Sequence, residues 1–328
     1  MRALILNDTS RAGHLGCSLV MSNLVHGVIG CGFTSHKSIS LRDIRNSNLQ
    51  AEICKSDLVI LNGEGTMHDD QPAARRWTEL CMSANSIGKP VALINTVWQN
   101  NKVVTPLLEC CSLITCRESM SAAAIRQPGR EVAVVPDLSL SVELQIRRRL
   151  DTKCESLAVI DSVYSSVSGA LAGFARLNTA PFFHMGGGAS ASARDLWKWI
   201  CARGRNRVER RLTRRSVRSI RDSEVIVTGR FHGVCLAILL NRPFVAITSN
   251  THKIEGLLVD AELGPCGQLL KANELDKTDV RGLCRELKEA AADTKIQDEF
   301  RNACMEYRRK ATIGGMATFR ALVKLAKG

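Results

Sequence analysis

Short apolar runs alternate with polar turns and helical stretches along most of the chain. In its first part these runs predict five strands, at Ala3–Leu6, Asp57–Leu61, Pro90–Asn95, Leu113–Cys116 and Val132–Val135. Strands that are apolar throughout are typical of a parallel sheet that helices cover on both faces. Helices are predicted between the strands, for example from Pro72 to Ile87, where a proline in the first helical turn is harmless.

The same alternation restarts after a charged stretch at residues 145–153, which we interpret as a linker. Strands are then predicted at Leu157–Ile160, Pro181–His184, Val225–Thr228, Phe244–Ile247 and Gly267–Leu270, and a helix at Asp195–Cys201. The pattern predicts two Rossmann-like, doubly wound α/β domains that face a central cleft. We expect an N-terminal domain at 1–145, a C-terminal domain at 155–300, and a basic helix at 301–328, broken at Gly314-Gly315, that packs back on the N-terminal domain.

The rest of the chain is organised around residues 224–253. This stretch predicts a strand at Val225–Thr228, a polar turn at Gly229–Gly233, a helix at Val234–Leu240 and a second strand. A strand-to-helix turn lies at the carboxyl edge of the sheet, where ligands bind, and the N–H groups of a helix start favour an anion. Arg230 adds a planar cationic fork suited to carboxylate or phosphate. The turn therefore predicts an anion site that includes Arg230 and His232.

A second polar loop, Asn62 to Asp70, follows the predicted strand Asp57–Leu61. It carries Glu64 between two glycines, and His68 and Asp69 close by. We interpret Glu64 and His68 as site residues. Asp70 is expected only to complement the dipole of the following helix.

Further candidates stand at the ends of other predicted strands. Asn7, Asp8 and His14 follow the first strand and either face the crevice or cap the next helix. Arg117 follows the strand that ends at Cys116 and is a second candidate anion ligand, although it could equally pair with Glu118 or Asp137. Ser119 is expected to cap the helix from Met120 to Ile125.

Composition narrows the classes of function. The net charge is +13 and the pI about 9.4, which raises nucleic acid as a partner. Aromatic residues are only 4% of the chain, with no basic–aromatic interleaving for base stacking, so we expect no nucleic acid. An anionic small substrate, the anionic inner face of a membrane, or a solvated basic surface explains the charge equally well.

Cysteines and apolar segments indicate the compartment. The chain has 13 cysteines, an odd number without any Cys-x-x-Cys, and most lie in apolar runs, which favours buried reduced thiols over metal binding. No apolar run is long enough to span a bilayer, and the first residues lack the pattern of a signal peptide. We expect a cytoplasmic protein without a metal, with peripheral contact to the inner membrane as a hypothesis from the basic tail.

Several of these motifs occur together in the order found in one family. They are Asp57-Leu-Val-Ile-Leu-Asn-Gly-Glu-Gly-Thr66, Arg117-Glu-Ser119, Val135-Pro-Asp137, Val227-Thr-Gly-Arg-Phe-His-Gly233 and Pro243-Phe244 followed by Lys253. Over roughly residues 3–265 the chain resembles the polysaccharide pyruvyl transferases, whose two-domain architecture is similar to that of GT-B glycosyltransferases. Many members have three glycines where this chain has Asn62-Gly63-Glu64-Gly65.

The resemblance implies that phosphoenolpyruvate is the donor and a pair of sugar hydroxyls the acceptor, with a pyruvate ketal and phosphate as products. It implies no cofactor beyond this co-substrate. Because the donor carries a carboxylate and a phosphate, it needs at least two cationic or N–H-rich anchors. Donor contacts are expected from Arg230, Gly229, Gly233, Arg117 and Lys253.

The reaction also needs a general acid near the methylene carbon and a base near the attacking hydroxyl. His232 is the first candidate for phosphate contact or proton transfer, while Glu64, His68 and Asp137 compete for the acid and base roles. The acceptor, a sugar or a lipid-linked oligosaccharide, is expected on the side of Asn7, Asp8, His14 and Asp69.

Two other functions fit the sequence. A GT-B-type glycosyltransferase with a nucleotide-sugar donor would use the same types of cationic anchor. A basic scaffold that binds anionic glycans or membranes would instead depend on the charges of Arg301–Lys327 and not on the turn at Gly229–Gly233.

Overall fold

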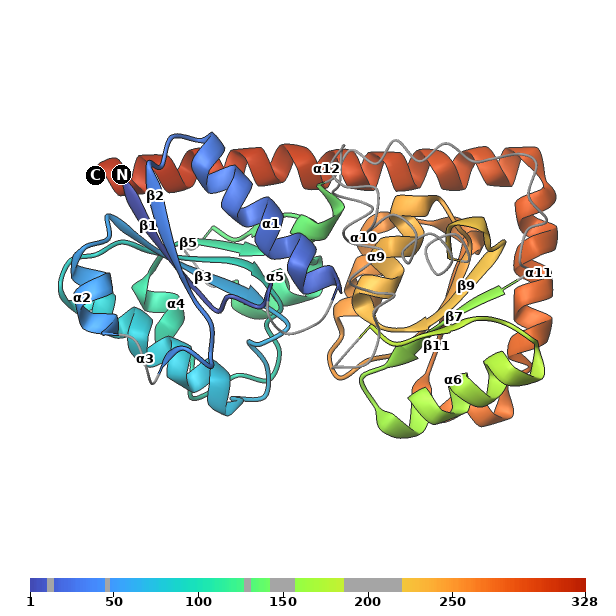
Figure 1. The fold of residues 1–328 in the computed structure, drawn as a ribbon. Helices are drawn as coiled ribbons and strands as arrows, with labels where there is room; N and C mark the ends of the chain where they lie inside the picture. Colours follow the sequence, from blue (N-terminus) through green and yellow to red (C-terminus); the bar gives the residue numbers. More distant parts are fainter. Residues whose placement is uncertain (11–14, 45–47, 127–130, 142–156, 186–219) are drawn as a thin grey trace, which may run out of the picture. The chain divides into compact units, whose positions relative to one another are not determined.

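The computed structural model describes residues 1–10, 15–44, 48–126, 131–141, 157–185 and 220–328. The chain divides into two compact units, each built on one parallel sheet (Figure 1). The first unit comprises Met1–Arg11, Val20–Ser141 and Arg309–Gly328, and the second comprises Ala12–Leu19 and Val142–Arg308. The prediction of two α/β domains with parallel sheets is confirmed. The helix predicted at Asp195–Cys201 lies outside the described residues.

The sheet of the first unit has six parallel strands in the order β2-β1-β3-β4-β5-β6. The strands are β1 (Arg2–Leu6), β2 (Ser35–Ile39), β3 (Leu58–Glu64), β4 (Val91–Thr96), β5 (Cys111–Cys116) and β6 (Ala133–Val134). The helices between them are α1 (Leu15–Gly30), α2 (Leu49–Cys54), α3 (Pro72–Ser86), α4 (Pro106–Cys110) and α5 (Ser119–Ile125), followed by the short 3-10 helix η3 (Leu138–Leu140).

Helices cover both faces of this sheet, which explains its continuous apolar strands. Side chains of β1 alternate between two cores: Leu4 and Leu6 pack with α2, α3, α4 and α5, whereas Ala3 and Ile5 pack with α1 and the end of the last helix. Figure 1 shows α1 and the last helix on one side of the sheet and α2, α3 and α4 on the other. Because helices cover both faces, polar groups gather at the edges of the sheet.

The sheet of the second unit has five parallel strands in the order β11-β10-β9-β7-β8. They are β7 (Leu157–Ser162), β8 (Phe182–Phe183), β9 (Val225–Gly229), β10 (Phe244–Ile247) and β11 (Gly267–Leu270). The helices are α6 (Ser165–Leu177), α9 (Phe231–Leu240), α10 (Lys253–Ala261) and α11 (Val280–Ala292), with 3-10 turns η4 (Gly264–Cys266) and η5 (Ala272–Lys277). Helix α9 is buried from Phe231 to Leu239, as expected of a helix that is apolar on all sides.

The last helix, α12 (Thr294–Lys327), is continuous over 34 residues. Its residues up to Arg308 belong to the second unit and those from Arg309 belong to the first. The predicted break at Gly314-Gly315 is wrong, because a glycine is tolerated inside a helix where close packing compensates for its low propensity. At Gly314 an added Cβ would lie 2.9 Å from Val135 Cγ1, so the helix packs directly on the segment that follows β6.

None of the helices within the described ranges is both long and apolar enough to cross a membrane.

Candidate functional site

Each sheet has one point at which the strand order reverses. In the first unit β1 lies between β2 and β3, and in the second unit β7 lies between β8 and β9. In open parallel sheets, ligands bind outside the carboxyl ends of the strands at such a switch point. The carboxyl edges beside β1 and β3, and beside β7 and β9, are therefore the places to look for functional side chains.

The switch point of the second unit is bridged by an ion pair. Arg230, directly after β9, donates from Nε to Asp161 Oδ1 at 3.0 Å and from Nη2 to Asp161 Oδ2 at 2.8 Å. Asp161, near the end of β7, is 2% exposed, and its Oδ1 also accepts from the Met185 backbone N–H at 3.0 Å. His184 Nδ1 lies 3.6 Å from its Oδ2. A guanidinium has five N–H donors, and the pair with Asp161 uses two of them.

Two glycines allow the turn after β9 to come close to its surroundings. A Cβ added at Gly229 would lie 2.5 Å from Ser162 Cβ, and one added at Gly233 would lie 2.1 Å from Thr228 Oγ1. The Arg230 backbone N–H donates to Thr228 Oγ1 at 3.1 Å. The backbone of Gly229–Gly233 is thus fixed against β7 and β9, and no larger residue fits at either glycine without movement of its neighbours.

His232 is buried in the first turn of α9, which starts at Phe231 and not at Val234 as predicted. Its ring packs on Gly16, in the first turn of α1, which belongs to the same unit. A Cβ added at Gly16 would lie 1.9 Å from His232 Cγ. The absence of a side chain at Gly16 is therefore a condition for the observed position of the imidazole.

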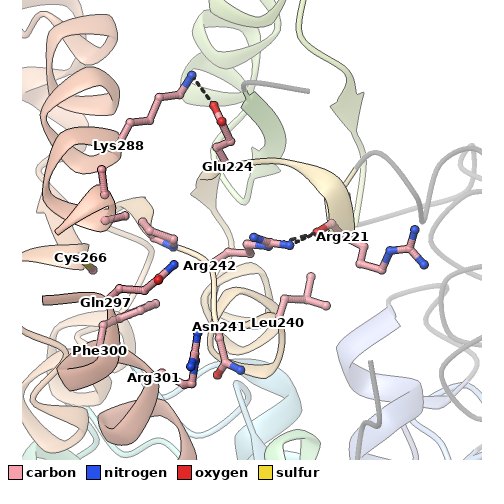
Figure 2. Close-up of a pocket in the computed structure, with 13 residues that line it drawn as sticks. Arg221, Glu224, Leu240, Asn241, Arg242, Cys266, Lys288, Gln297, Phe300 and Arg301 are labelled. Carbon is pink, nitrogen blue, oxygen red and sulfur yellow. Dashed lines mark hydrogen bonds and ion pairs between the residues drawn. The ribbon is translucent and has the colours of Figure 1, made fainter. Parts of the chain in front are cut away.

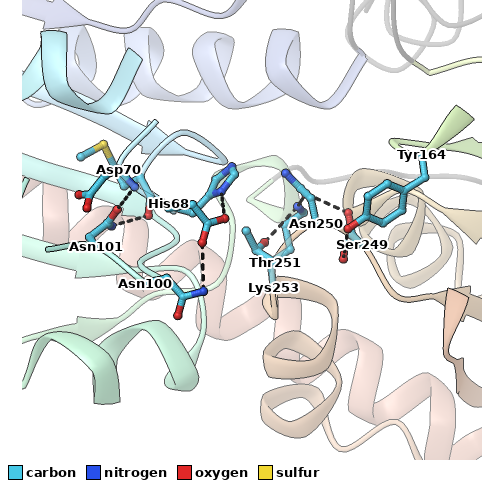
Figure 3. A network of polar contacts seen from close by, with 11 residues as sticks. His68, Asp70, Asn100, Asn101, Tyr164, Ser249, Asn250, Thr251 and Lys253 are labelled. Atoms are coloured by element: carbon cyan, nitrogen blue, oxygen red, sulfur yellow. Dashed lines mark hydrogen bonds and ion pairs between the residues drawn. The ribbon is translucent and has the colours of Figure 1, made fainter. Parts of the chain in front are cut away.

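Lys253 is the first residue of α10 and is 6% exposed. Its ammonium donates to Asn250 Oδ1 and, at 3.1 Å, to Thr251 Oγ1, as Figure 3 shows. Nearby, the Tyr164 hydroxyl donates to the Ser249 carbonyl at 3.4 Å. The loop after β10 thus holds a buried cation at the carboxyl edge of the sheet that also carries Arg230.

Asn7 bridges the switch point of the first unit. Its side-chain Nδ2 donates to the Asn62 carbonyl at 2.7 Å and to Thr66 Oγ1 at 3.0 Å. Asp8 instead stabilises the turn after β1, because its Oδ1 accepts from the Ser10 backbone N–H at 2.9 Å. His14 lies outside the described residues.

Three buried residues at this edge have left-handed backbone conformations, although none is glycine. They are Asn7 (φ 63°) after β1, Glu64 (φ 43°) at the end of β3, and Asn95 (φ 54°) in β4. Such conformations are uncommon for residues with a Cβ and cluster at functional sites. The loop predicted at Asn62 to Asp70 begins later than expected, because Asn62, Gly63 and Glu64 are the last residues of β3.

Arg117 is fully enclosed at the end of β5. Its Nη1 lies 3.3 Å from Asp137 Oδ2, and the two side chains are 1% and 0% exposed. Asp137 Oδ1 also accepts from the Ser139 backbone N–H at 2.9 Å, which starts η3. The expected pair of Arg117 with Asp137 is confirmed. Gly65 is close to this pair, because a Cβ added there would lie 3.8 Å from Arg117 Nη2.

Glu118 has a different role. Its carboxylate accepts from the Ser121 backbone N–H at 2.9 Å and caps α5. The prediction that Ser119 caps this helix is wrong, because Ser119 is already its first residue. A buried glutamate that satisfies a helix start is a structural residue.

His68 and Asp69 form a hydrogen-bonded pair, drawn in Figure 3. His68 is 9% exposed, and its Nδ1 lies 2.8 Å from Asp69 Oδ2. Asn100 Nδ2 donates to Asp69 Oδ1 at 3.0 Å. The hydrogen bond with His68, and then that with Asn100, lowers the pKa of the Asp69 carboxyl. The pair is a histidine oriented by a carboxylate, an arrangement suited to proton transfer.

Asp70 has specific hydrogen-bond partners that the sequence did not predict. Its carboxylate accepts from the backbone N–H groups of Lys102, Val103 and Val104, at 2.9 to 3.1 Å. Burial raises the pKa of Asp70, but these N–H donors together lower it below its ordinary value. Asp70 therefore holds the loop after β4 against the loop that carries His68.

The sequence profile described as "Polysaccharide pyruvyl transferase" matches residues 19–251. The chain belongs to this family. The matched residues include Glu64, His68 and Asp137 in the first unit and Asp161, Arg230 and His232 in the second, whereas Asn7, Asp8, His14 and Lys253 lie outside the match. A search of the curated proteins finds no match.

Solved structures similar to this pyruvyl transferase family member include MurG from Acinetobacter baumannii, with 12% identity, 100% of both chains covered and a TM-score of 0.52. Another is Arabidopsis thaliana UGT89C1 complexed with quercetin, with 9% identity, 99% of both chains covered and a TM-score of 0.57. Identities this low show the fold alone, which is the GT-B architecture of two parallel-sheet domains. The predicted fold class is confirmed to that extent.

A separate cavity of about 570 Å³ lies at the opposite edge of the second sheet (Figure 2). Its lining includes Glu224, Pro243 and Cys266, which directly precede β9, β10 and β11. Lys288 is paired with Glu224 at 2.8 Å, and Arg242 donates twice to the Arg221 carbonyl. Because this cavity lies at the amino ends of the strands and its cations are engaged, we do not place the transferase site there.

Asp161 is a candidate site residue that the sequence analysis missed. It directly follows the predicted strand Leu157–Ile160 and was assigned no role. The signal that would have identified it is an aspartate directly after an apolar run, where the neighbouring strand is followed by an arginine.

Proposed function

We propose that the protein transfers the pyruvyl group of phosphoenolpyruvate to two hydroxyls of a sugar, which forms a pyruvate ketal and releases phosphate. Membership of the pyruvyl transferase family supports this class of reaction. The observation that carries the proposal is the geometry of Arg230. Asp161 holds its guanidinium at the switch point of the second sheet, next to the start of α9. A fixed guanidinium and the N–H groups of a helix start together favour an anion.

The donor has two anionic groups, so a second anchor is required. Lys253 is held at the same edge of the same unit, in the first turn of α10. We assign the phosphate and carboxylate of phosphoenolpyruvate to Arg230, the turn Gly229–Gly233 and Lys253. Arg117 is a weaker candidate than the sequence suggested, because its buried pair with Asp137 gives it a structural partner.

The chemistry then needs a proton transfer at each step. A proton is added to the methylene carbon, the C2 carbon becomes oxocarbenium-like, and a sugar hydroxyl attacks it and loses its own proton. The C2–O bond to phosphate then breaks, and the phosphate leaves with a proton. The second hydroxyl attacks C2 and loses its own proton, which completes the ketal. We propose His232 for the donor side. On the acceptor side we propose His68, which Asp69 orients through Nδ1, for the proton transfer from a hydroxyl.

Glu64 is the alternative base. Its left-handed backbone conformation at the end of β3 fixes the position from which its side chain extends. Asp137 is less suited, since it already accepts from Arg117 and from the Ser139 backbone N–H. Asn7 and Asp69, on the edge of the first sheet, are proposed for acceptor hydroxyls. The acceptor in this proposal is a sugar or a lipid-linked oligosaccharide of an exopolysaccharide. The location is the cytoplasm, where thiols such as those of the buried cysteines stay reduced.

The test is incubation of the protein with phosphoenolpyruvate and a panel of glycosides. We expect phosphate release together with the mass increase of a pyruvate ketal on at least one glycoside. The variant H232Q should lose both signals while its far-UV circular dichroism stays unchanged. Release of phosphate without any glycoside product would contradict the transfer.

A GT-B-type glycosyltransferase is the second candidate, because solved structures similar in fold include MurG and a plant UGT. Isothermal titration separates the two. Binding of phosphoenolpyruvate without binding of nucleotide sugars supports pyruvyl transfer, and the reverse result supports glycosyl transfer.

A further inference from the structure

Helix α1 and the C-terminal part of α12 border a groove of about 820 Å³ in the first unit. Figure 1 shows the two helices beside each other over the sheet. They approach closely at Gly27, where an added Cβ would lie 2.2 Å from Phe319 Cε2. The volume is in the range of pockets that bind small molecules, about 300–1,000 Å³. The groove is on a face of the sheet and not at its carboxyl edge, so the proposed reaction does not use it.

The lining of the groove is largely apolar. Gly30, Cys31, Met316, Phe319 and Val323 contribute to it. Met316 is 46% exposed. Apolar side chains that gather around a groove and remain open to solvent mark an interaction site.

The charges at the groove are all of one sign. Among its described lining residues, the ionisable side chains other than Cys31 are His26, Arg320 and Lys324. The sequence explains this, because residues 9–42 and 307–328 contain no aspartate or glutamate. A ligand bound at this surface binds more tightly if it places negative charge near Arg320 and Lys324.

We propose that this groove binds the apolar chain of an anionic membrane lipid, whose head group is held by Arg320 and Lys324. An apolar chain fits the apolar part of the lining, and an anionic head group fits its cations Arg320 and Lys324. A second copy of the chain fits less well, since two such surfaces would bring like charges together. The protein would thereby be held at an anionic membrane surface, whatever sugar it modifies.

The test is flotation of the full chain with vesicles of phosphatidylcholine, alone or mixed with phosphatidylglycerol. We expect binding to the mixed vesicles only, weakened by salt. The double variant R320E/K324E should bind at least about 25-fold more weakly, since each basic residue near an anionic surface contributes about fivefold. The double variant K277E/K295E, with the same change in net charge at exposed positions of the second unit, should bind like the wild type.

The apolar part is tested with a matched pair on α12. M316Q replaces an exposed groove residue by a polar one of similar size, and M305Q makes the same change at a side chain that is 49% exposed and outside the groove. We expect binding about tenfold weaker for M316Q and unchanged for M305Q. Equal binding of the two variants would overturn the groove as the lipid site. Binding to pure phosphatidylcholine, or to no vesicle, would overturn the anionic lipid. Phosphate release with a soluble glycoside should be the same in wild type and M316Q, so a failed vesicle test leaves the reaction itself untouched.

Discussion

The guanidinium of Arg230 is hydrogen-bonded through two nitrogens to the two carboxylate oxygens of Asp161, across the switch point of the second sheet. The pair joins the ends of β7 and β9, which are neighbours in space but about seventy residues apart in sequence. Asp161 thus fixes the direction of the cation and neutralises part of its charge. If Arg230 binds the donor, its affinity depends on a residue that does not have to touch the donor itself.

The first prediction follows from this pair. D161N keeps the shape of the side chain but removes its charge, so Arg230 loses its fixed orientation. Hydrogen bonds to charged groups contribute about 1.5–3 kcal/mol, and we expect the KM for phosphoenolpyruvate to rise roughly tenfold or more. Steady-state kinetics of phosphate release measures this. D222N is the matched control, because Asp222 has a similar bidentate pair with Arg221 at 2.6 and 2.9 Å. A lower KM in D161N would show that Asp161 keeps Arg230 away from the donor.

The second prediction concerns the contact of Gly16 with His232. G16A places a Cβ where the imidazole lies, so the ring must move. We expect kcat to fall at least tenfold, with a loss of stability of about 1–3 kcal/mol from overpacking. Kinetics and thermal unfolding measure the two effects. In G169A, on α6, the added Cβ meets no atom within 4 Å, and this control should be slightly more stable and fully active. Unchanged kcat in G16A would remove His232 from the mechanism.

The third prediction is a pH dependence. The pKa of Asp69 is below its ordinary value of 3.8 in the folded protein, so its contact with His68 stabilises the fold when the carboxyl is ionised. This contribution is fully present above the unfolded pKa and is lost as the pH falls through the lowered folded pKa. We expect the wild type to be more stable than D69N at neutral pH and the difference to shrink in acid. Urea unfolding of both proteins across that range measures it, and a difference that grows in acid would contradict the assignment.

The fourth prediction compares the two adjacent glycines of α12. At Gly314 an added Cβ would lie 2.9 Å from Val135 Cγ1, whereas at Gly315 the nearest atom would be 3.6 Å away. Alanine is the better helix former by about 1 kcal/mol, so G315A should be neutral or more stable. G314A should be less stable by about 1–3 kcal/mol, because Val135 must shift. Thermal unfolding of both variants decides it, and equal stabilisation of both would show that this packing is loose.

The sequence predicted the strands whose side chains are buried on both faces, because their apolar runs are continuous. It missed β2, Ser35–Ile39, since this edge strand is polar and exposed except at its end. The helices α3, α5 and α9 were predicted within a few residues of their observed bounds. The error at Gly314-Gly315 arose because a propensity rule was applied where tertiary packing favours the small residue.

The candidate site was predicted in part. The turn with Arg230 and the loop with His68 are visible as glycine-bracketed polar residues after apolar runs. The partners are not, because Asp161 and Arg230 become neighbours only through the strand order, which local sequence does not encode. For the same reason the sequence left the pair of Arg117 with Asp137 as one of two alternatives. The hydrogen bonds of Asp70 likewise depend on the distant loop at Lys102–Val104.

The left-handed conformations of Asn7, Glu64 and Asn95 have a consequence for how this protein can diverge. A residue with a Cβ is strained in this conformation by roughly 1–2 kcal/mol, and glycine, asparagine and aspartate adopt it most readily. Mutational libraries at these three positions should therefore return few residue types. New acceptor preferences would arise in the surrounding loops, while the strand ends keep their backbone path.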